Sequence, residues 1–485
     1  MPEVDHQHPL YEELKPSWDQ VNDCIKGERQ VKKKKDIYLP KPNPSDVSAE
    51  NETRYNQYLT RAVFYNVTAR TLSGLVGQVF SKDPVVEVPP LLDSIIEDSD
   101  GSGVSLVQQS KCVLGCVLAN GRAGLFVDYP TVEGTATRQD QLDGSIRPNI
   151  LHYNAPSIIN WRSERQGAKN RLTLIVLSET YVDSDDGFKE EIVEQFRVLR
   201  LVEGIYQVQI YRRSTAQGSG AYGLVEEYTP TSAQGSPLTE IPFQFIGWEN
   251  NDETPDLPPL YDLSVLNLAH FRNSADYEEA CYIVGQPTPY MTGLDQSWVD
   301  DVLKGQVHLG SRSAVPLPEG GSMGLVQASA NSMPKEAMDT KERQMVALGA
   351  KLVENKNVQR TATEAGMDNA SETSVLASAA NNTAEAFRTA LKWCMEFVGT
   401  SGEVDFSLHT DFVNHTLNPQ QQGALLSLWQ NDVLTWDELR DNLKKASIAE
   451  LPNDEARDII DASALDGLDQ IDDEVDDVDE EEEND

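Results

Sequence analysis

Three predicted helices separated by two non-helical segments occupy residues 257–398, and this arrangement constrains the fold more than any other part of the chain. The first helix is predicted over 260–284, because Pro258 and Pro259 are tolerated in a first helical turn and Gly285 ends the helical pattern. Its apolar and aromatic residues do not keep to one narrow stripe. We therefore expect more than one side of this helix to be covered, as in a helix packed between subunits.

The second helix is predicted over 332–352, with Ser332 as a candidate N-cap. Met338, Met345 and Leu352 recur every seven residues on one face, and charged residues occupy most of the rest. At 1.5 Å per residue the helix is roughly 30 Å long. It should have one packed edge and a large solvated surface, which also describes an ordinary surface helix of a globular domain.

Residues 353–373 lack a sustained apolar period and are rich in Asn, Thr and Gly, so they predict an exposed loop. Helical spacing returns over 374–399, and a strand is expected within 403–412. The candidate buried positions of this third helix are Val375, Ala379, Phe387, Leu391, Cys394 and Val398.

The remainder of the chain predicts an α+β fold. One long helix is expected over 50–81 and a second over 104–119, followed by a short strand in GLFVDYP. Between 150 and 247, several β-branched and aromatic segments separated by turn residues predict a largely antiparallel sheet. After Phe412, a helix is expected from Asn418-Pro419, and Thr435 with Glu438 predicts a capping box for another. The expected strand segments are ILHYN, LTLIVLSETYV, EEIVEQFRVLRLV, IYQVQIYRR, LVEEYT and IPFQFIGW.

Length and composition describe a globular chain with several structural modules. The 485 residues are 39% hydrophobic and 25% charged. No apolar run approaches the roughly 20 residues that span a bilayer, and the N-terminus has no signal-peptide pattern. We therefore expect no membrane partner and a protein that stays in the cytoplasm where it is made.

The cysteines and histidines predict no metal site and no cofactor. The five cysteines are scattered, and the closest two, Cys112 and Cys116, fall inside a predicted helix. We expect reduced, mostly buried thiols. The seven histidines are also dispersed, and His6 and His8 lie in a polar N-terminal arm.

The net charge of −39 is concentrated toward the C-terminus. Residues 452–485 contain 17 Asp and Glu and one Arg, which predicts a disordered, solvated tail. The remaining 451 residues are still acidic, which argues against tight nonspecific binding to phosphates. Acidity is compatible with a DNA conduit, however, because repulsion keeps the cargo from adhering to the wall.

Two short motifs have the composition of binding sites. Gly218-Ser-Gly220-Ala-Tyr-Gly223 fits G-x-G-x-x-G, but a strand follows it instead of a helix, so a hairpin loop is the better interpretation. The basic run Lys32–Lys35, with Lys26 and Arg29 before it, could bind nucleic acid or an acidic partner surface, but a solvated basic loop is the better interpretation. The sequence contains no P-loop, nucleophile-elbow or H-E-x-x-H motif, so we expect no enzymatic activity.

The order of these segments resembles the portal proteins, or head-to-tail connectors, of tailed double-stranded-DNA bacteriophages. The helix, small insert, helix, RTATEA-type loop, helix and EVDFSLHTDF strand follow the family's order, and the segments WDQVNDCIKGE, KKKKDIYLPKP and YNQYLTRAVFYNVTARTLSGLVGQVFSKDP are similar to one subgroup. The resemblance covers about residues 10–450. It implies an α+β portal fold with an α/β wing, helical stem, small α/β clip, channel loop and short helical crown.

The resemblance also implies a domain division and a biological role. In chain order the divisions are an α+β wing (1–256), first stem helix (257–284), clip (285–331), second stem helix (332–352), channel loop (353–373), wing return helix and strand (374–412), crown helices (413–451) and acidic disordered tail (452–485). Portals form a ring, typically a dodecamer, at one capsid vertex of the virion and assemble in the host bacterial cytoplasm. Double-stranded viral DNA is packaged and ejected through the ring. The implied protein partners are terminase, the major capsid protein, scaffold and the head-completion or tail adaptor proteins.

The polar residues of the loop are the candidate DNA-facing site, because they lie between helices and have no apolar face to bury. They are Asn355, Lys356, Asn357, Gln359 and Arg360. The alternative is an exposed connector that does not touch DNA. For the whole chain, the alternatives are a phage-encoded nucleic-acid-processing enzyme and another capsid or scaffold component.

Overall fold

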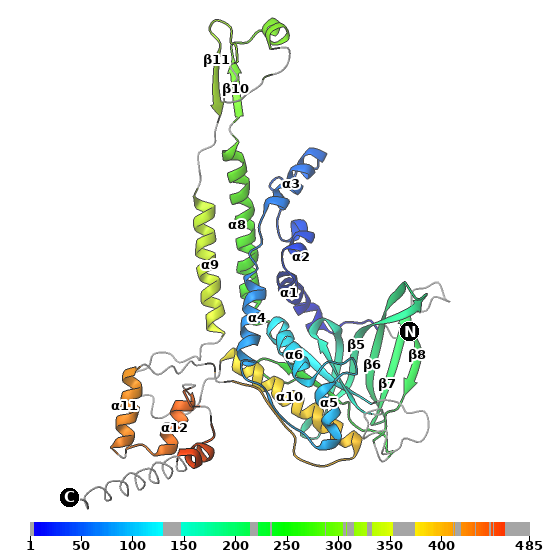
Figure 1. Cartoon of the computed structure of the whole chain (residues 1–485). Helices are drawn as coiled ribbons and strands as arrows, with labels where there is room; N and C mark the ends of the chain where they lie inside the picture. Colours follow the sequence, from blue (N-terminus) through cyan, green and yellow to red (C-terminus); the bar gives the residue numbers. More distant parts are fainter. Residues whose placement is uncertain are drawn as a thin grey trace, which may run out of the picture. The chain divides into compact units, whose positions relative to one another are not determined.

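The computed structural model describes residues 4–129, 147–213, 222–232, 235–286, 288–303, 307, 315–326, 332–352, 374–410, 412, 419–431, 433–445, 448–449 and 451–460. The chain divides into two compact units, Met1–Thr410 and Asp411–Asp485. Helices and strands both contribute substantially, which confirms the α+β class (Figure 1). No described helix is long and apolar enough to cross a membrane.

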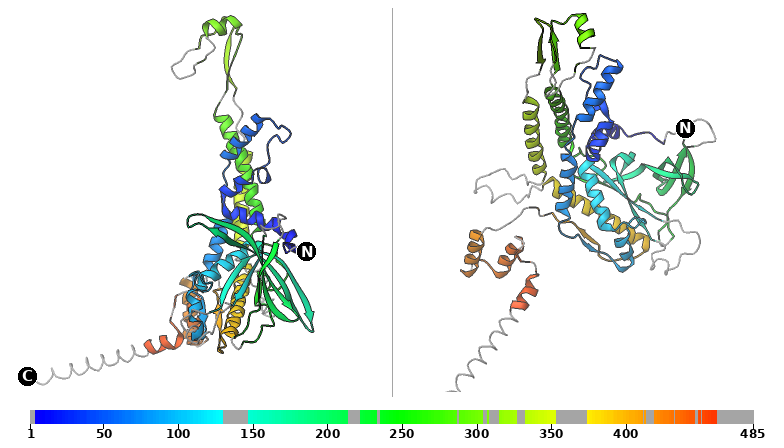
Figure 2. Two further views of the ribbon diagram at one scale, coloured as in Figure 1. Left: turned by 90° about the vertical axis from the view of Figure 1, so that its right-hand side faces the viewer. Right: turned by 45° about the horizontal axis from the view of Figure 1, so that its top comes forward.

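The first unit contains a group of helices organised around α8 (Tyr261–Gly285). Helix α9 runs beside α8 in Figure 1 and in the right-hand view of Figure 2, and other helices also contact α8, as expected for a helix covered on more than one side. The members of this group besides α8 are α1 (Pro9–Lys26), α2 (Glu28–Lys33), the helical turn η1 (Lys35–Ile37), α3 (Ala49–Arg61), α4 (Val67–Val79) and α9 (Met333–Lys351).

The predicted single helix over 50–81 is wrong, because the chain breaks between α3 and α4. The Asn66 side chain caps α4 by accepting a hydrogen bond from the amide of Ala69 at 3.0 Å. The exposed backbone of the break is bonded by α8: the Val63 amide donates to Ser274 Oγ at 3.0 Å, and Asn267 Nδ2 donates to the Tyr65 carbonyl at 2.8 Å. These partners lie about 200 residues further along the chain, so local periodicity could not indicate them.

A five-stranded antiparallel sheet forms the largest β element, with its strands adjacent in chain order. The last two strands pair antiparallel, and residues 214–221, which hold most of the glycine-rich motif predicted as a hairpin loop, lie outside the described residues. The strands are β4 (Ile158–Gln166), β5 (Lys169–Asp185), β6 (Glu190–Val202), β7 (Ile205–Arg213) and β8 (Tyr222–Tyr228). Strand β4 was not predicted, because its apolar residues are confined to its first half and its last five residues are charged or polar.

A second, three-stranded antiparallel sheet has the order β3-β2-β9. Helices α6 and α10 contact it, and α10 also contacts the short strand β12. Phe243 and Phe245 of β9 join Trp161 of β4 and Trp18 of α1 in one core that the two sheets share. The elements are β2 (Arg122–Asp128), β3 (Asn149–Asn154), β9 (Phe243–Gly247), α6 (Leu106–Asn120), α10 (Val375–Val398) and β12 (Asp405–Ser407), which pairs with β1 (Val85–Glu87).

The predicted polar N-terminal arm is also corrected. His8 is the N-cap of α1, where its Nδ1 accepts a hydrogen bond from the Leu10 amide at 3.2 Å. Its ring stacks on Trp161 with centroids 4.0 Å apart. The aromatic contact and the buried face of α1 together hold this segment against the sheet core.

The smaller elements complete the first unit. Strands β10 (Thr288–Thr292) and β11 (Ser322–Val326) form an antiparallel pair within the predicted clip. Short helical segments lie at η2 (Pro90–Leu92), α5 (Asp93–Glu97), η3 (Ala155–Ser157) and η4 (Trp298–Val302).

The second unit contains α11 (Pro419–Gln430), α12 (Trp436–Lys445) and a further helix over 453–460. The capping box predicted at Thr435 and Glu438 is confirmed, with the Glu438 amide donating to Thr435 Oγ1 at 3.2 Å and the Thr435 amide donating to Glu438 Oε2 at 2.8 Å. The predicted disordered tail begins too early, because Ala456 is buried and Arg457 lies 4.8 Å from the Trp436 ring centroid. Residues 461–485 lie outside the described residues.

Candidate functional site

The ends of the predicted channel loop meet at the junction of α9 and α10. Helix α9 ends at Lys351, and the next carbonyl, that of Leu352, accepts a hydrogen bond from the Leu376 amide at 3.2 Å. Ser374 caps α10 by accepting a hydrogen bond from the Ala377 amide at 3.2 Å. The described residues on either side of 353–373 therefore lie close together. We call this junction, formed by Leu352, Ser374 and Leu376, the loop base.

The five predicted DNA-facing residues lie outside the described residues, and their prediction is not tested. They are Asn355, Lys356, Asn357, Gln359 and Arg360. What the structure adds is the placement of both ends of the segment that contains them.

Helix α9 reaches the loop base with one narrow packed edge. Met345 is 1% exposed, while Met338 and Leu352 are half-buried, which agrees with the predicted seven-residue spacing. His270 of α8 is buried and its Nε2 lies 3.2 Å from Glu342 Oε1 on α9. Near the end of α9, Gly349 lies against Thr71 of α4.

Helix α10 anchors the other end of the loop base in the core. Five of its six predicted buried positions are buried, and Val375 is half-buried because Leu376 takes the interior position in the first turn. Phe387 stacks on Phe406 of β12 with ring centroids 5.0 Å apart. Because α10 is held over its whole length, the position of Ser374 is fixed by extensive packing.

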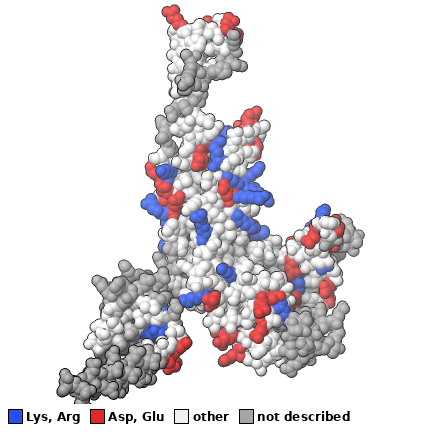
Figure 3. All heavy atoms as spheres, in the orientation of Figure 1, with Lys and Arg blue, Asp and Glu red and all other residues white. Residues whose placement is uncertain are grey.

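The basic segment, residues 26–41, holds seven Lys and Arg and two Asp and Glu in a chain that is otherwise acidic. It is not the solvated loop that the sequence favoured, because it contains α2 and η1. Lys34 pairs with buried Asp23 at 3.2 Å and Lys32 with Glu28 at 2.6 Å. Figure 3 shows Lys and Arg side chains over the group of helices around α8, to which α2 and η1 belong. The exposed cations of the segment are Lys26, Arg29, Lys33 and Lys35.

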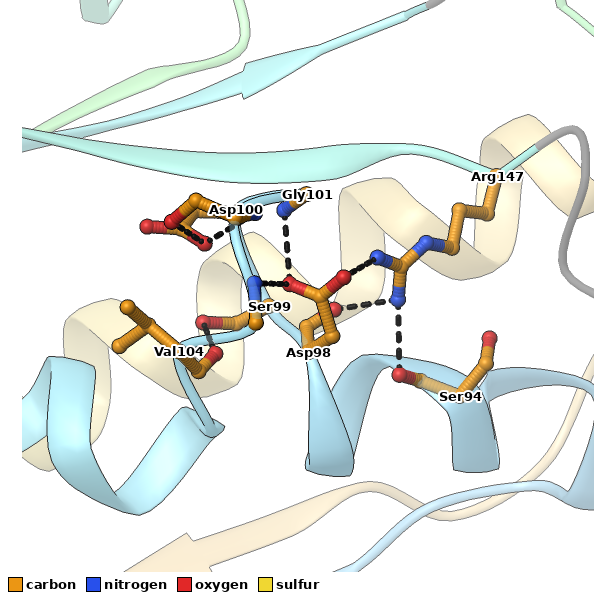
Figure 4. Close-up of polar contacts among 9 residues, drawn as sticks. Ser94, Asp98, Ser99, Asp100, Gly101, Val104 and Arg147 are labelled. Carbon is orange, nitrogen blue, oxygen red and sulfur yellow. Dashed lines mark hydrogen bonds and ion pairs between the residues drawn. The ribbon is translucent and has the colours of Figure 1, made fainter.

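The acidic loop between α5 and α6 has the composition of a cation site but is closed by its own chain (Figure 4). Asp98 Oδ1 accepts hydrogen bonds from the amides of Gly101 and Gly103, both at 2.9 Å, and its other carboxylate oxygen pairs with Arg147. Burial alone would raise the pKa of Asp98, but the Gly103 amide and the Arg147 guanidinium outweigh burial and hold this pKa below its usual value. The site is therefore a structural loop anchor.

A buried guanidinium at the start of β2 is also structural. Arg122 lies between the rings of Trp161 and Phe245, 4.1 and 4.0 Å from their centroids, and Nη1 donates to the Glu253 carbonyl at 3.0 Å. Burial lowers its pKa to about 9. This contact joins the sheet core to the segment that leads into α8.

The thiols are less buried than predicted. All five cysteines are free; Cys24 and Cys394 are buried, Cys116 is half-buried, and Cys112 and Cys281 are exposed. Among the residues that the structure describes, no three His, Cys, Asp or Glu side chains converge to hold a metal ion.

Comparisons with known proteins give one family match and several structural matches. Residues 259–398, from the start of α8 to the end of α10, match a family described as a domain of unknown function (DUF4055). No curated protein matches the sequence. A chain in the virion of a native gene transfer agent (GTA) particle is similar at TM-score 0.37 and 12% identity, over 76% of this chain and 85% of that chain.

Chains in two GTA neck structures are similar at the same level. In the neck of the native particle with C12 symmetry, the TM-score is 0.37 and the identity 11%, over 79% of this chain and 90% of that chain. In the neck of the empty particle with C6 symmetry, the TM-score is 0.37 and the identity 12%, over 81% of this chain and 93% of that chain.

Proposed function

We propose that this chain is a portal-type subunit that assembles into a closed ring in a virion and conducts double-stranded DNA. The observation that carries the proposal is the loop base: the Leu376 amide donates to the Leu352 carbonyl, so the described residues on either side of a 21-residue polar segment lie close together. A segment held in this way can extend from a packed wall without disturbing it. In the proposed ring it faces DNA through Asn355, Lys356, Asn357, Gln359 and Arg360.

Exposed apolar side chains on the helices around the loop base support self-association. Val346 of α9 is 71% exposed, and Tyr282 and Ile283 at the end of α8 are each 46% exposed. The β10–β11 pair is a two-stranded sheet, a form that is marginal in water unless something packs on it, and Leu325 of β11 is exposed. Repeated head-to-tail contact between copies would cover these residues, and a rotation that closes would make a ring.

Charge supports sliding contact with DNA in the proposed channel. The chain carries a net charge of −39, so most of its surface repels phosphate. A few cations per subunit, Lys356 and Arg360 in this proposal, would then make weak, salt-sensitive contacts. In the proposed ring, the subunit has the wing, clip and crown divisions given above and docks terminase, capsid and adaptor proteins.

Electron micrographs of the purified full chain test the proposal directly. We expect closed rings with a central hole, twelve-fold inside particles, and no nuclease or ATPase activity with Mg²⁺. In an assembly assay, changing Lys356 and Arg360 together to Ala should leave the rings intact and alter DNA packaging or retention. A chain that stays monomeric across concentration, salt and pH would overturn the ring. Unchanged packaging in the double variant would remove these two residues from the site.

A further inference from the structure

A cysteine and a histidine meet on the surface where α6 packs on β3. Cys112 and His152 are both exposed, and Cys112 Sγ lies 3.5 Å from His152 Nε2. Both side chains are held by regular structure. His152 lies opposite Leu125 in the β2–β3 ladder, and α6 begins with a full capping box at Ser105 and Gln108. The contact therefore belongs to two fixed elements.

The groups around this pair favour a thiolate beside an imidazolium. Cys116 lies one helical turn further along α6. Its hydrogen bond to Cys112 is the largest cause that lowers the pKa of the Cys112 thiol well below its ordinary value, and the hydrogen bond from His152 is the second. In return, the Cys112 sulfur raises the pKa of His152, and the Asp100 carboxylate acts in the same direction. At neutral pH the arrangement thus stabilises a negative sulfur that solvent can reach.

We propose that Cys112 is a modification site: a nucleophilic thiolate, activated by His152 and Cys116, that reacts with small soluble disulfides of the glutathione type. The thiolate attacks one sulfur of the disulfide, a new S–S bond forms, and the original S–S bond breaks. Its electron pair leaves with the second thiolate, which takes a proton from the His152 imidazolium or from water. Cys112 is thereby oxidised to a mixed disulfide and half of the reagent is reduced to a thiol.

Peptide mapping by mass spectrometry after brief exposure of the full chain to glutathione disulfide tests this proposal. Cys281 is the matched internal control, since it is an exposed thiol on a helix with the Tyr277 hydroxyl as its neighbour. For an ordinary thiol with a pKa of about 8.5, the thiolate fraction falls by several tens of times between pH 8 and pH 6. We expect the Cys112 rate to change by less than about threefold between these two pH values, and by less than the Cys281 rate.

A substitution separates activation from simple exposure. His152→Gln keeps a polar side chain on β3 and removes the imidazole while Cys116 remains, so the Cys112 rate should become more pH-dependent than in the unsubstituted chain. Iodoacetamide in place of the disulfide should give the same profiles, because both reactions consume the thiolate. The unsubstituted chain alone can overturn the proposal. It would do so if the Cys112 modification rate depended on pH as steeply as the Cys281 rate, or if Cys112 were not modified at either pH.

Discussion

Asn267 of α8 is fully buried and makes three hydrogen bonds to the chain around the start of α4. Its Oδ1 accepts from the Thr68 amide at 3.1 Å and from the Thr68 hydroxyl at 2.9 Å, and its Nδ2 donates to the Tyr65 carbonyl at 2.8 Å. Two of the three partners are backbone groups, the Tyr65 carbonyl in the break and the Thr68 amide in the first turn of α4. One amide side chain therefore satisfies polar groups that the break would otherwise leave unbonded.

We predict that Asn267→Ala destabilises the chain by roughly 2–4 kcal/mol, because the buried Thr68 amide and the Tyr65 carbonyl lose their partner at about 1–3 kcal/mol each. Asn273→Ala is the control, since Asn273 lies on the same helix and is half-buried; its effect should stay within about 1 kcal/mol. Urea unfolding followed by far-UV circular dichroism measures both. Equal midpoints for the two variants would show that the Asn267 bonds contribute little.

The break near Asn267 also shows where sequence reasoning stops. The apolar positions Tyr55, Leu59, Val76 and Val79 keep a helical period through 50–81, and all four are buried, yet the helix is interrupted between them. Side chains of the distant helix α8 supply the bonds that stabilise the interruption. By contrast, the capping box at Thr435 and Glu438 was predictable, because both partners lie within one helical turn.

Helices α8, α9 and α10 follow the sequence closely because their limits are local. The predicted spans 260–284 and 332–352 differ from α8 and α9 by one residue at each end, and the prediction for the third helix differs from α10 equally little. Pro, Gly and Ser at the ends decide these limits. The hydrogen bond that closes the loop base was not predictable, since it joins backbone groups of Leu352 and Leu376 and carries no side-chain signature.

The loop base leads to a prediction about the segment it closes. Replacing residues 355–372 by a short Gly-Ser linker should leave the fold intact, because the ends already meet and closing a shorter loop costs no more entropy. We expect a melting temperature within about 2 °C of the full chain. Ring formation should persist, while DNA packaging should be impaired.

A matched substitution tests the base itself. Ser374→Ala removes the side-chain acceptor at the start of α10 and should cost about 1 kcal/mol with the loop left complete. The linker variant should be more stable than Ser374→Ala if residues 355–372 project from the fold. Equal destabilisation of the two variants would mean that residues 355–372 contribute packing that their composition does not indicate, and their assignment as a projecting loop would be wrong.

Across the whole molecule, the sequence indicated strand locations better than strand partnership. The six predicted strand segments all coincide with strands, because each carries β-branched or aromatic residues between turns. Their division into a five-stranded and a three-stranded sheet depends on β9 pairing with β2, more than 100 residues earlier. For the candidate site, the loop's limits were predictable and its contacts were not, since DNA and neighbouring copies supply the partners in the proposed assembly.

The negative charge of the C-terminal region is expected to oppose assembly. Residues 461–485 hold 14 Asp and Glu and no Lys or Arg, whereas the preceding helix 453–460 packs on α12 through Ala456 and Arg457. Truncation after Ile460 therefore removes 14 carboxylates and keeps the packed helix 453–460. In a ring the repulsion among these carboxylates is repeated between copies and is screened by salt over about 10 Å at 0.1 M.

We predict that the chain truncated after Ile460 forms rings at lower salt than the full chain, and that the difference disappears near 0.5 M salt, where screening is nearly complete. Truncation after Leu451 is the structural control: it also removes helix 453–460, so the Asn453 amide no longer bonds to Asp441 and α12 should be less stable. Light scattering and micrographs across a salt series measure assembly. Loss of rings on removing only 461–485 would mean that the acidic segment makes specific contacts, and repulsion would then be the wrong account of its charge.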